Sequence, residues 1–232
     1  MKANKHFQHT RLFPVTLTLA GILIGLGLAL LAVWADYEST AYGFVRRAQA
    51  PFQGLICPVF IGKHESKVVS IKIFNPTDQI LSPGVLTQIS TPSELSSEIE
   101  HVRLAPGEQI TLQRTIGPEN IDLAMFIFVD TLIYATYPIP DRETTCGILV
   151  LPVANGTRLL IFGTALSTLL MSTGTYILVK DIRLRPSLHS LMFMVVATVL
   201  AMILGFTGWW LPAVILTLII RAGAFLTQQT ET

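Results

Sequence analysis

An uninterrupted apolar run near the start of the sequence, Leu12 to Ala35, constrains the fold more than any other feature. The run contains no charged residue and stops abruptly at Asp36. A bilayer core about 30 Å thick needs roughly 20 apolar residues in a helix that rises 1.5 Å per residue, so this run is long enough to cross it. The apolar core of a secretory signal is shorter, about 7 to 15 residues, and the nearby small-residue site "VWA" is poor. We therefore expect a retained anchor, with a cleaved signal as the alternative.

Three more apolar segments in the last third of the chain predict further spans: Arg158–Val179, Leu188–Phe206 and Trp209–Leu226. The composition agrees, because 51% of the residues are hydrophobic and only 13% are charged, whereas about a quarter of a soluble chain is charged. The turn "GFTG" separates the last two segments and suits a tight helical hairpin. Arg221 interrupts the fourth segment, a cost that is relieved if its side chain reaches the interface. The sequence predicts a membrane protein with four transmembrane helices.

Basic residues next to the expected spans predict the orientation, since they stay on the cytoplasmic side. With four spans, three groups of basic residues fall on one side: Lys2, Lys5 and Arg11 before the first span, Lys180, Arg183 and Arg185 in the loop after the second, and Arg221 near the end of the fourth. The region 36–156 carries a net charge of about −5, which agrees with a place outside. Tryptophans stand at the expected outer ends of spans, as in an interfacial belt: Trp34, Trp209 and Trp210. We expect a plasma-membrane protein with both termini cytoplasmic and 36–156 extracytoplasmic.

The external region predicts an all-β domain over 55–151. Short runs rich in β-branched and aromatic residues alternate there with turn clusters such as "NPTD", "SPG" and "APGE". Seven strands are expected, with the sequences LICPVFI, KVVSIKIF, VLTQIST, EIEHVRL, QITLQRTI, AMFIFVDTLIYATY and CGILVLP. This number and spacing of strands favour an antiparallel β-sandwich.

Two stretches of this region carry a resemblance, "KVVSIKIFNPTDQILSPG" and "VRLAPGEQITLQRTI". A strand that ends in Asn-Pro and a strand preceded by Leu-Ala-Pro-Gly-Glu resemble the immunoglobulin-like sandwiches of bacterial surface proteins, including the CARDB adhesion-type modules. The resemblance implies a fold and a place outside cells, because its motifs are turn residues and not site residues.

The expected organisation is one anchor, an inserted external domain and three further spans. In chain order it comprises a cytoplasmic tail (1–11), the first span (12–35), a linker (36–54), the external sandwich (55–151), the second span (158–179), a cytoplasmic loop (180–187), the third span (188–206), the fourth span (209–226) and a cytoplasmic tail (227–232).

The two cysteines both fall in the external domain, where oxidation is permitted. Cys57 lies in the first expected strand and Cys146 opens the last. We expect a disulfide that joins the ends of the sandwich, with two buried free thiols as the alternative. A lipid-modified cysteine is disfavoured because Cys57 lies well beyond the apolar run, and a metal site because no histidine has ligand spacing.

Candidate catalytic and metal-binding residues are few. His64–Glu65 is an isolated pair in a turn, and Glu98, Glu100 and His101 share one expected strand. Alternation along a strand puts the two carboxylates on one face and the histidine on the other, which favours a solvated strand face over a cation site. No serine-hydrolase, phosphate-loop or zinc-protease motif is present, so we expect no catalytic, cofactor or metal site and no enzymatic activity. The acidic external region argues against nucleic-acid binding.

Small residues in the first two spans predict close helix packing. Gly21 and Gly25 form a G-x-x-x-G pair, and Gly163 and Gly174 lie in a span rich in serine and threonine. Their partner is either another helix of this chain or another membrane subunit. The spans lack central Asp, Glu and Lys residues, which disfavours a transporter component. We expect a non-enzymatic accessory or scaffolding subunit of a membrane complex, with a cell-surface binding or adhesion module as the alternative.

Overall fold

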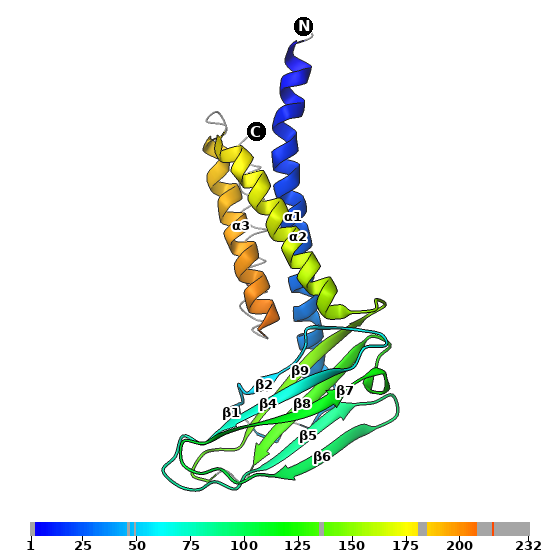
Figure 1. The fold of residues 1–232 in the computed structure, drawn as a ribbon, viewed down its shortest axis with the longest axis vertical. Coiled ribbons are helices and arrows are strands. Elements are labelled where there is room, and N and C mark those ends of the chain that lie inside the picture. The colour runs from blue at the N-terminus through cyan, green and yellow to red at the C-terminus, as the bar shows by residue number, and fades with distance from the viewer. Residues whose placement is uncertain are drawn as a thin grey trace. The chain divides into compact units, whose positions relative to one another are not determined.

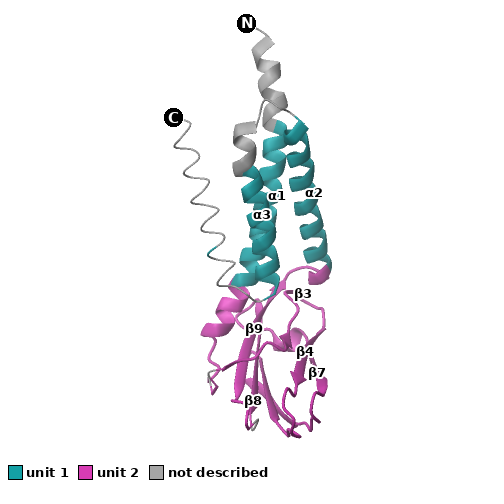
Figure 2. Ribbon diagram, turned by 90° about the vertical axis from the view of Figure 1, so that its left-hand side faces the viewer, with its two compact units in different colours: residues 1–33, 158–232 teal, residues 34–157 magenta. Residues whose placement is uncertain are grey.

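The computed structural model describes residues 3–45, 47–48, 50–134, 137–180, 185–207 and 215, with the backbone alone for 3–12 and 185–190. The chain divides into two compact units (Figure 2). The helical unit comprises 1–33 and 158–232, and the sheet unit comprises 34–157. The first helix, α1 (Ala3–Ala41), contributes to both: it belongs to the sheet unit from Trp34 onward. It therefore continues past Ala35 into the region expected as a linker.

The helical unit contains α1, α2 (Gly156–Lys180) and α3 (Arg185–Phe206) (Figure 1). By length and composition, two stretches could cross a membrane, Phe13–Ala41 and Gly156–Lys180; the apolar part of α3, Leu191–Phe206, is shorter. The described residues thus contain three helices where four spans were expected. The fourth expected span, Trp209–Leu226, lies outside the described residues except for Ile215, and so do Trp209, Trp210 and Arg221.

The small residues of the spans lie where helices of this chain meet. A β-carbon added at Gly21 would lie 2.8 Å from the Met171 side chain and from the carbonyl oxygen of Ser167 on α2. One added at Gly25 would meet Ser167 on α2 and Met202 on α3, at 2.8 and 3.0 Å. The Ser167 hydroxyl donates a 2.8 Å hydrogen bond to the carbonyl of Gly21. Close backbone approach of this kind stabilises helix packing in lipid.

The other two predicted glycines also face neighbouring helices. A β-carbon at Gly174 would lie 2.1 Å from the hydroxyl of Thr18 on α1, and one at Gly163 would lie 2.9 Å from Leu28. All four glycines therefore face other helices of this chain.

Replacing Gly21 with leucine is expected to destabilise the helical unit by about 2 kcal/mol or more, because the added side chain meets α2 backbone that cannot rotate away. Thermal unfolding of the full chain in detergent measures the effect. Gly27→Leu is the matched control on the same helix, since nothing lies within 4 Å of a β-carbon added there. Equal midpoints for the two variants would contradict this packing.

The sheet unit is built from two sheets. The larger has the order β1-β9-β8-β5-β6, with β3 also paired to β9, and the smaller has the order β2-β4-β7. β1 and β3 run parallel to β9, and the other pairs are antiparallel. The strands are β1 (Ala50–Pro51), β2 (Leu55–Ile56), β3 (Phe60–Gly62), β4 (Lys67–Phe74), β5 (Gly84–Ser90), β6 (Leu95–His101), β7 (Gln109–Ile116), β8 (Phe126–Tyr134) and β9 (Arg142–Leu151).

The core of the sheet unit lies between the two sheets. Val69 and Ile116 of the smaller sheet pack in one cluster with Ile127, Val129 and Ile148 of the larger. All five are buried side chains on alternating strand positions. This arrangement buries apolar side chains of both sheets in one layer, as in β-sandwiches.

The expected strand LICPVFI is not one strand. β2 pairs with β4 in the smaller sheet, the chain then changes sheets at Cys57 and Pro58, and β3 pairs with β9 in the larger. Proline supplies no amide hydrogen for a ladder, so it marks the point where pairing stops. Two expected strands, KVVSIKIF and QITLQRTI, have the same bounds as β4 and β7.

The turns that carried the family resemblance are joined by one buried side chain, Asn75. Its amide nitrogen donates to the carbonyls of Gln79, Leu104 and Ala105, and its amide oxygen accepts from the backbone and hydroxyl of Thr77. The asparagine is thus fully hydrogen-bonded in a site that excludes water. Asn75 fixes the turn after β4 against the turn before β7.

Candidate functional site

The larger sheet is covered on its outer face at β8. Every residue of β8 from Phe126 to Ile133 is buried, which requires cover on both faces of the sheet. The cover comes from the last turns of α1 and the residues that follow. The Trp34 ring lies 5.1 Å from the Phe126 ring, edge to face, and the Tyr42 ring lies 4.3 Å from that of Phe128.

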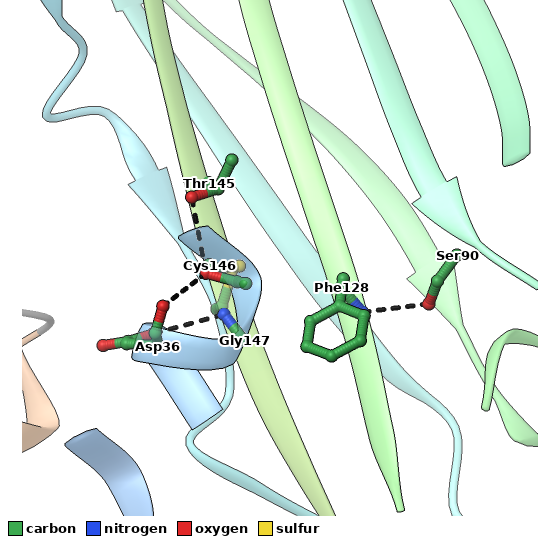
Figure 3. The surroundings of a disulfide bond; sticks show 8 residues. Asp36, Ser90, Phe128, Thr145, Cys146 and Gly147 are labelled. Atoms are coloured by element: carbon green, nitrogen blue, oxygen red, sulfur yellow. Dashed lines mark hydrogen bonds between the residues drawn. A yellow bond between two sulfur atoms is a disulfide. The ribbon is translucent and has the colours of Figure 1, made fainter. Parts of the chain in front are cut away.

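Gly147 of β9 lets the helix backbone touch the sheet (Figure 3). A β-carbon added at Gly147 would lie 1.8 Å from the carbonyl oxygen of Ala35. The backbone amide of Gly147 donates to the Asp36 carboxylate at 3.2 Å, and the hydroxyls of Ser39 and Thr145 form a 3.3 Å hydrogen bond. Asp36, the first residue after the apolar run, is therefore hydrogen-bonded to a strand of the larger sheet.

Tyr42 continues this contact beyond the end of α1. Its hydroxyl donates a 2.5 Å hydrogen bond to the Asp122 carboxylate, whose other oxygen accepts from the backbone of Leu123. Burial, together with the bond to the Asp122 carboxylate, raises the pKa of Tyr42 to about 12. The phenol stays protonated at physiological pH and holds the loop before β8.

The disulfide between Cys57 and Cys146 links the two sheets. Cys57 follows β2 of the smaller sheet and Cys146 lies in β9 of the larger, and both pack against the core cluster. The bond was expected to join the ends of the sandwich. It joins the two layers instead, because its cysteines come from different sheets. Cys146 is not at a strand end, since β9 extends beyond it in both directions.

Glu65 caps the start of α2. One carboxylate oxygen accepts 2.9 Å hydrogen bonds from the backbone amides of Gly62 and Gly156, and the other lies 2.9 Å from the Lys67 ammonium. Burial by itself raises the pKa of this carboxyl, but the bonds from Lys67, Gly62 and Gly156 outweigh it, so the pKa is lower than usual. A carboxylate at a helix N-terminus is favourable because it satisfies free amides.

Replacing Glu65 with glutamine is expected to cost about 1 kcal/mol at pH 7, the usual value of a lost cap. Because the folded-state pKa is lowered, the contribution of Glu65 to stability is complete above its unfolded pKa near 4.5 and is lost as the pH falls through the folded value. The thermal midpoints of the parent chain and Glu65→Gln should converge as the pH drops below about 4.5. A difference that grows in acid would contradict this role.

The structure places the other predicted candidates at the surface. Glu98 and Glu100 of β6 both contact Arg114 of β7, at 3.2 and 2.6 Å, so an ion-pair cluster links two strands of different sheets. The His101 ring lies 6.4 Å from that of Tyr134, and His64 is exposed. Among the residues that the structure describes, no group of three His, Cys, Asp or Glu side chains could hold a metal ion.

A crevice of about 390 Å³ opens in the sheet unit. Its lining includes the buried side chains of Phe52, Ile73 and Ile133 and the cation Arg142. Lys72 and Phe74 border it from β4, but their side chains alternate with Ile73 and point outward from the strand. Arg142 stands opposite Ile133 in the ladder, so both side chains are on the inner face of the sheet. Among the described residues, the lining contains no carboxylate, although the external region is acidic. The chemistry suits an apolar ligand with an anionic group.

Sequence reasoning missed the residues that join the helix to the sheet. Gly147 and Asp122 have partners that are far away in the chain, and no local motif marks them. Glu65 was considered only as part of an isolated pair with His64, and its bond to the start of α2 was not foreseen. The one feature of the sequence that indicated a contact here is the abrupt end of the apolar run at Asp36, the residue that accepts the hydrogen bond from Gly147.

No protein-family model and no curated protein matches the sequence. Among solved structures, the chain is similar to a Paenibacillus sp. cycloisomaltooligosaccharide glucanotransferase, with 13% identity and a TM-score of 0.35 over 45% of this chain and 14% of that one. It is also similar to a Bacteroides uniformis β-glucuronidase, with 11% identity and a TM-score of 0.32 over 38% of this chain and 12% of that one. An Erythrobacter marinus β-glucosidase has 22% identity and a TM-score of 0.29 over 40% of this chain and 14% of that one. The chain spans a small part of these enzymes, and similarities at this level carry no argument about its activity.

Proposed function

We propose that the chain is a non-enzymatic accessory or scaffolding subunit of a membrane complex. Four helices, with the fourth at Trp209–Leu226, cross the plasma membrane, and both termini are cytoplasmic. The sheet unit is extracytoplasmic and immunoglobulin-like. Two apolar helices of sufficient length, the basic flanks of the spans and the inter-sheet disulfide support this arrangement.

The observation that carries the proposal is the difference between the outer faces of the two sheets. Over β8 and β9 the outer face of the larger sheet is covered by the end of α1 and the residues that follow, whereas Ile56, Val68 and Phe74 on the smaller sheet are each about half exposed. The residues that point outward from β4 and β7 include one cation and no carboxylate: Val68, Ser70, Lys72, Phe74, Gln109, Thr111, Gln113 and Thr115. We assign this face to a partner subunit whose external segment is apolar and uncharged or acidic.

Mild detergent extraction followed by size determination tests the proposal. The parent chain is expected in a defined assembly larger than one chain. The double variant Ile56→Lys with Val68→Lys should run alone, because two ammonium groups would have to be desolvated at the contact. Ile99→Lys on β6, also half exposed, is the control and should remain in the assembly. A parent chain that runs alone would reject the subunit function.

The crevice favours a second candidate, a surface module that binds an anionic, partly apolar ligand. In that case such ligands should raise the thermal midpoint of the parent chain and not that of Arg142→Gln, since binding to the folded state alone stabilises it. An equal rise in both chains would reject this site.

A further inference from the structure

The loop between η1 (Pro118–Asn120) and β8 ends in an unusual turn. Asp122 and Phe126 form an isolated β-bridge, with backbone hydrogen bonds of 2.7 and 3.0 Å in the two directions. The tip between them, residues 123–125, includes two residues in the left-handed region, Leu123 with φ of 45° and Ala124 with φ of 67°. Glycine and asparagine normally occupy such positions, because a larger side chain on the β-carbon is strained there.

Leu123 combines this strain with exposure. Its side chain is 59% exposed, and that of Met125 is 39% exposed. A leucine at this position is unfavourable in water for two reasons: its backbone conformation is strained, and its apolar side chain is exposed to solvent. Backbone strain of this kind clusters at sites that contact a ligand or another surface, so the strained and exposed tip is a candidate for such a contact.

The turn lies at the end of the sheet unit where the chain connects to its helices. The Trp34 ring contacts Phe126, directly after the turn. The Met125 carbonyl accepts a 2.8 Å hydrogen bond from Val150, near the end of β9 and shortly before α2 begins at Gly156. Lys63 belongs to the same end, because its amide donates to the carbonyl of Leu151.

We propose that the turn 122–125 is a lipid-contact loop that places Leu123 and Met125 in the interfacial region of the bilayer. The inference rests on the membrane anchoring in the proposed function, because a loop beside both connections to spanning helices lies at the membrane surface. Exposed leucine and methionine, a tryptophan that contacts the residue directly after the turn, and a lysine at the same end are residue types that bind this region. Both oxygens of the Asp122 carboxylate accept hydrogen bonds, one from the Tyr42 hydroxyl and one from the Leu123 amide.

The test uses the full chain in phosphatidylcholine–phosphatidylglycerol vesicles, with an environment-sensitive fluorophore on Leu123→Cys. Labelling proceeds without reductant, since Cys57 and Cys146 are bridged, and the unsubstituted chain measures the background. Ile99→Cys is the matched control because it is 58% exposed. The probe at 123 should be blue-shifted and quenched by lipids that carry a spin label near the headgroup, and the probe at 99 should not.

Equal, water-like emission from both probes in vesicle-integrated protein would overturn the lipid-contact loop and leave the anchoring intact. Release of the unlabelled chain from vesicles on flotation would instead reject the anchoring and, with it, this inference. Leu123→Gly separates contact from folding, since glycine accepts the left-handed conformation. The thermal midpoint of Leu123→Gly in detergent should not fall below that of the parent chain. A fluorophore on Met125→Cys should be quenched less by the spin-labelled lipids when Leu123→Gly is also present. A clear fall in the midpoint would show that Leu123 serves the folded domain and would overturn the proposal.

Discussion

Replacing Gly147 with alanine is expected to detach the end of α1 from the larger sheet and to destabilise the sheet unit by about 3 kcal/mol or more. The added β-carbon would lie 1.8 Å from the carbonyl oxygen of Ala35. The backbone of β9 fixes the position of this carbon and the backbone of α1 fixes that of the oxygen, so no side-chain rotation relieves the clash. The helix end has to move, which breaks the bond between Asp36 and Gly147 and opens the contact of Trp34 with Phe126. Thermal unfolding of the full chain in detergent, followed by tryptophan fluorescence, measures the loss.

Gly43→Ala is the control for this prediction. Gly43 follows the same helix, and nothing lies within 4 Å of a β-carbon added there, so its midpoint should stay close to that of the parent chain. If Gly147→Ala and Gly43→Ala unfold together, the end of α1 does not cover β8 and β9 as described.

Replacing Cys57 or Cys146 with serine is expected to lower the stability of the sheet unit by up to about 4 to 5 kcal/mol, and its thermal midpoint by roughly 10 °C or more. The two cysteines are separated by 89 positions in the sequence. Closing a loop of this length restricts the unfolded chain strongly in the chain-entropy model. The bond also holds the two sheets together at the core, so its loss should affect the whole sandwich.

The matched comparison is the double variant, in which both cysteines become serine. Its midpoint should agree with those of the single variants, because each removes the same covalent bond. Reductant should lower the midpoint of the parent chain and leave the variants unchanged. Complete alkylation of both cysteines in the folded parent chain without reductant would refute the bridge.

Local residue patterns were sufficient for some of the regular elements of this protein. β4 and β7 have the bounds that their alternating apolar residues predict, because one face of each strand must enter a core. The turns at Asn75 and at Gly107, where φ is 71°, depend on residues that favour turns wherever they occur. The apolar runs that became α1 and α2 were identified for the same reason, since length and hydropathy are properties of a segment alone.

Tertiary structure decided what those elements meet. The segment expected as one strand is divided between two sheets, because pairing with β4 and with β9 competes for it. Residues from Trp34 to Ala41 look like the end of a span followed by a linker, but they cover β8 and β9. Gly147, Glu65 and Arg114 acquire their roles from partners that the chain brings near only when it folds. Contacts between distant segments depend on the packing of whole faces, and the sequence around each residue does not encode them.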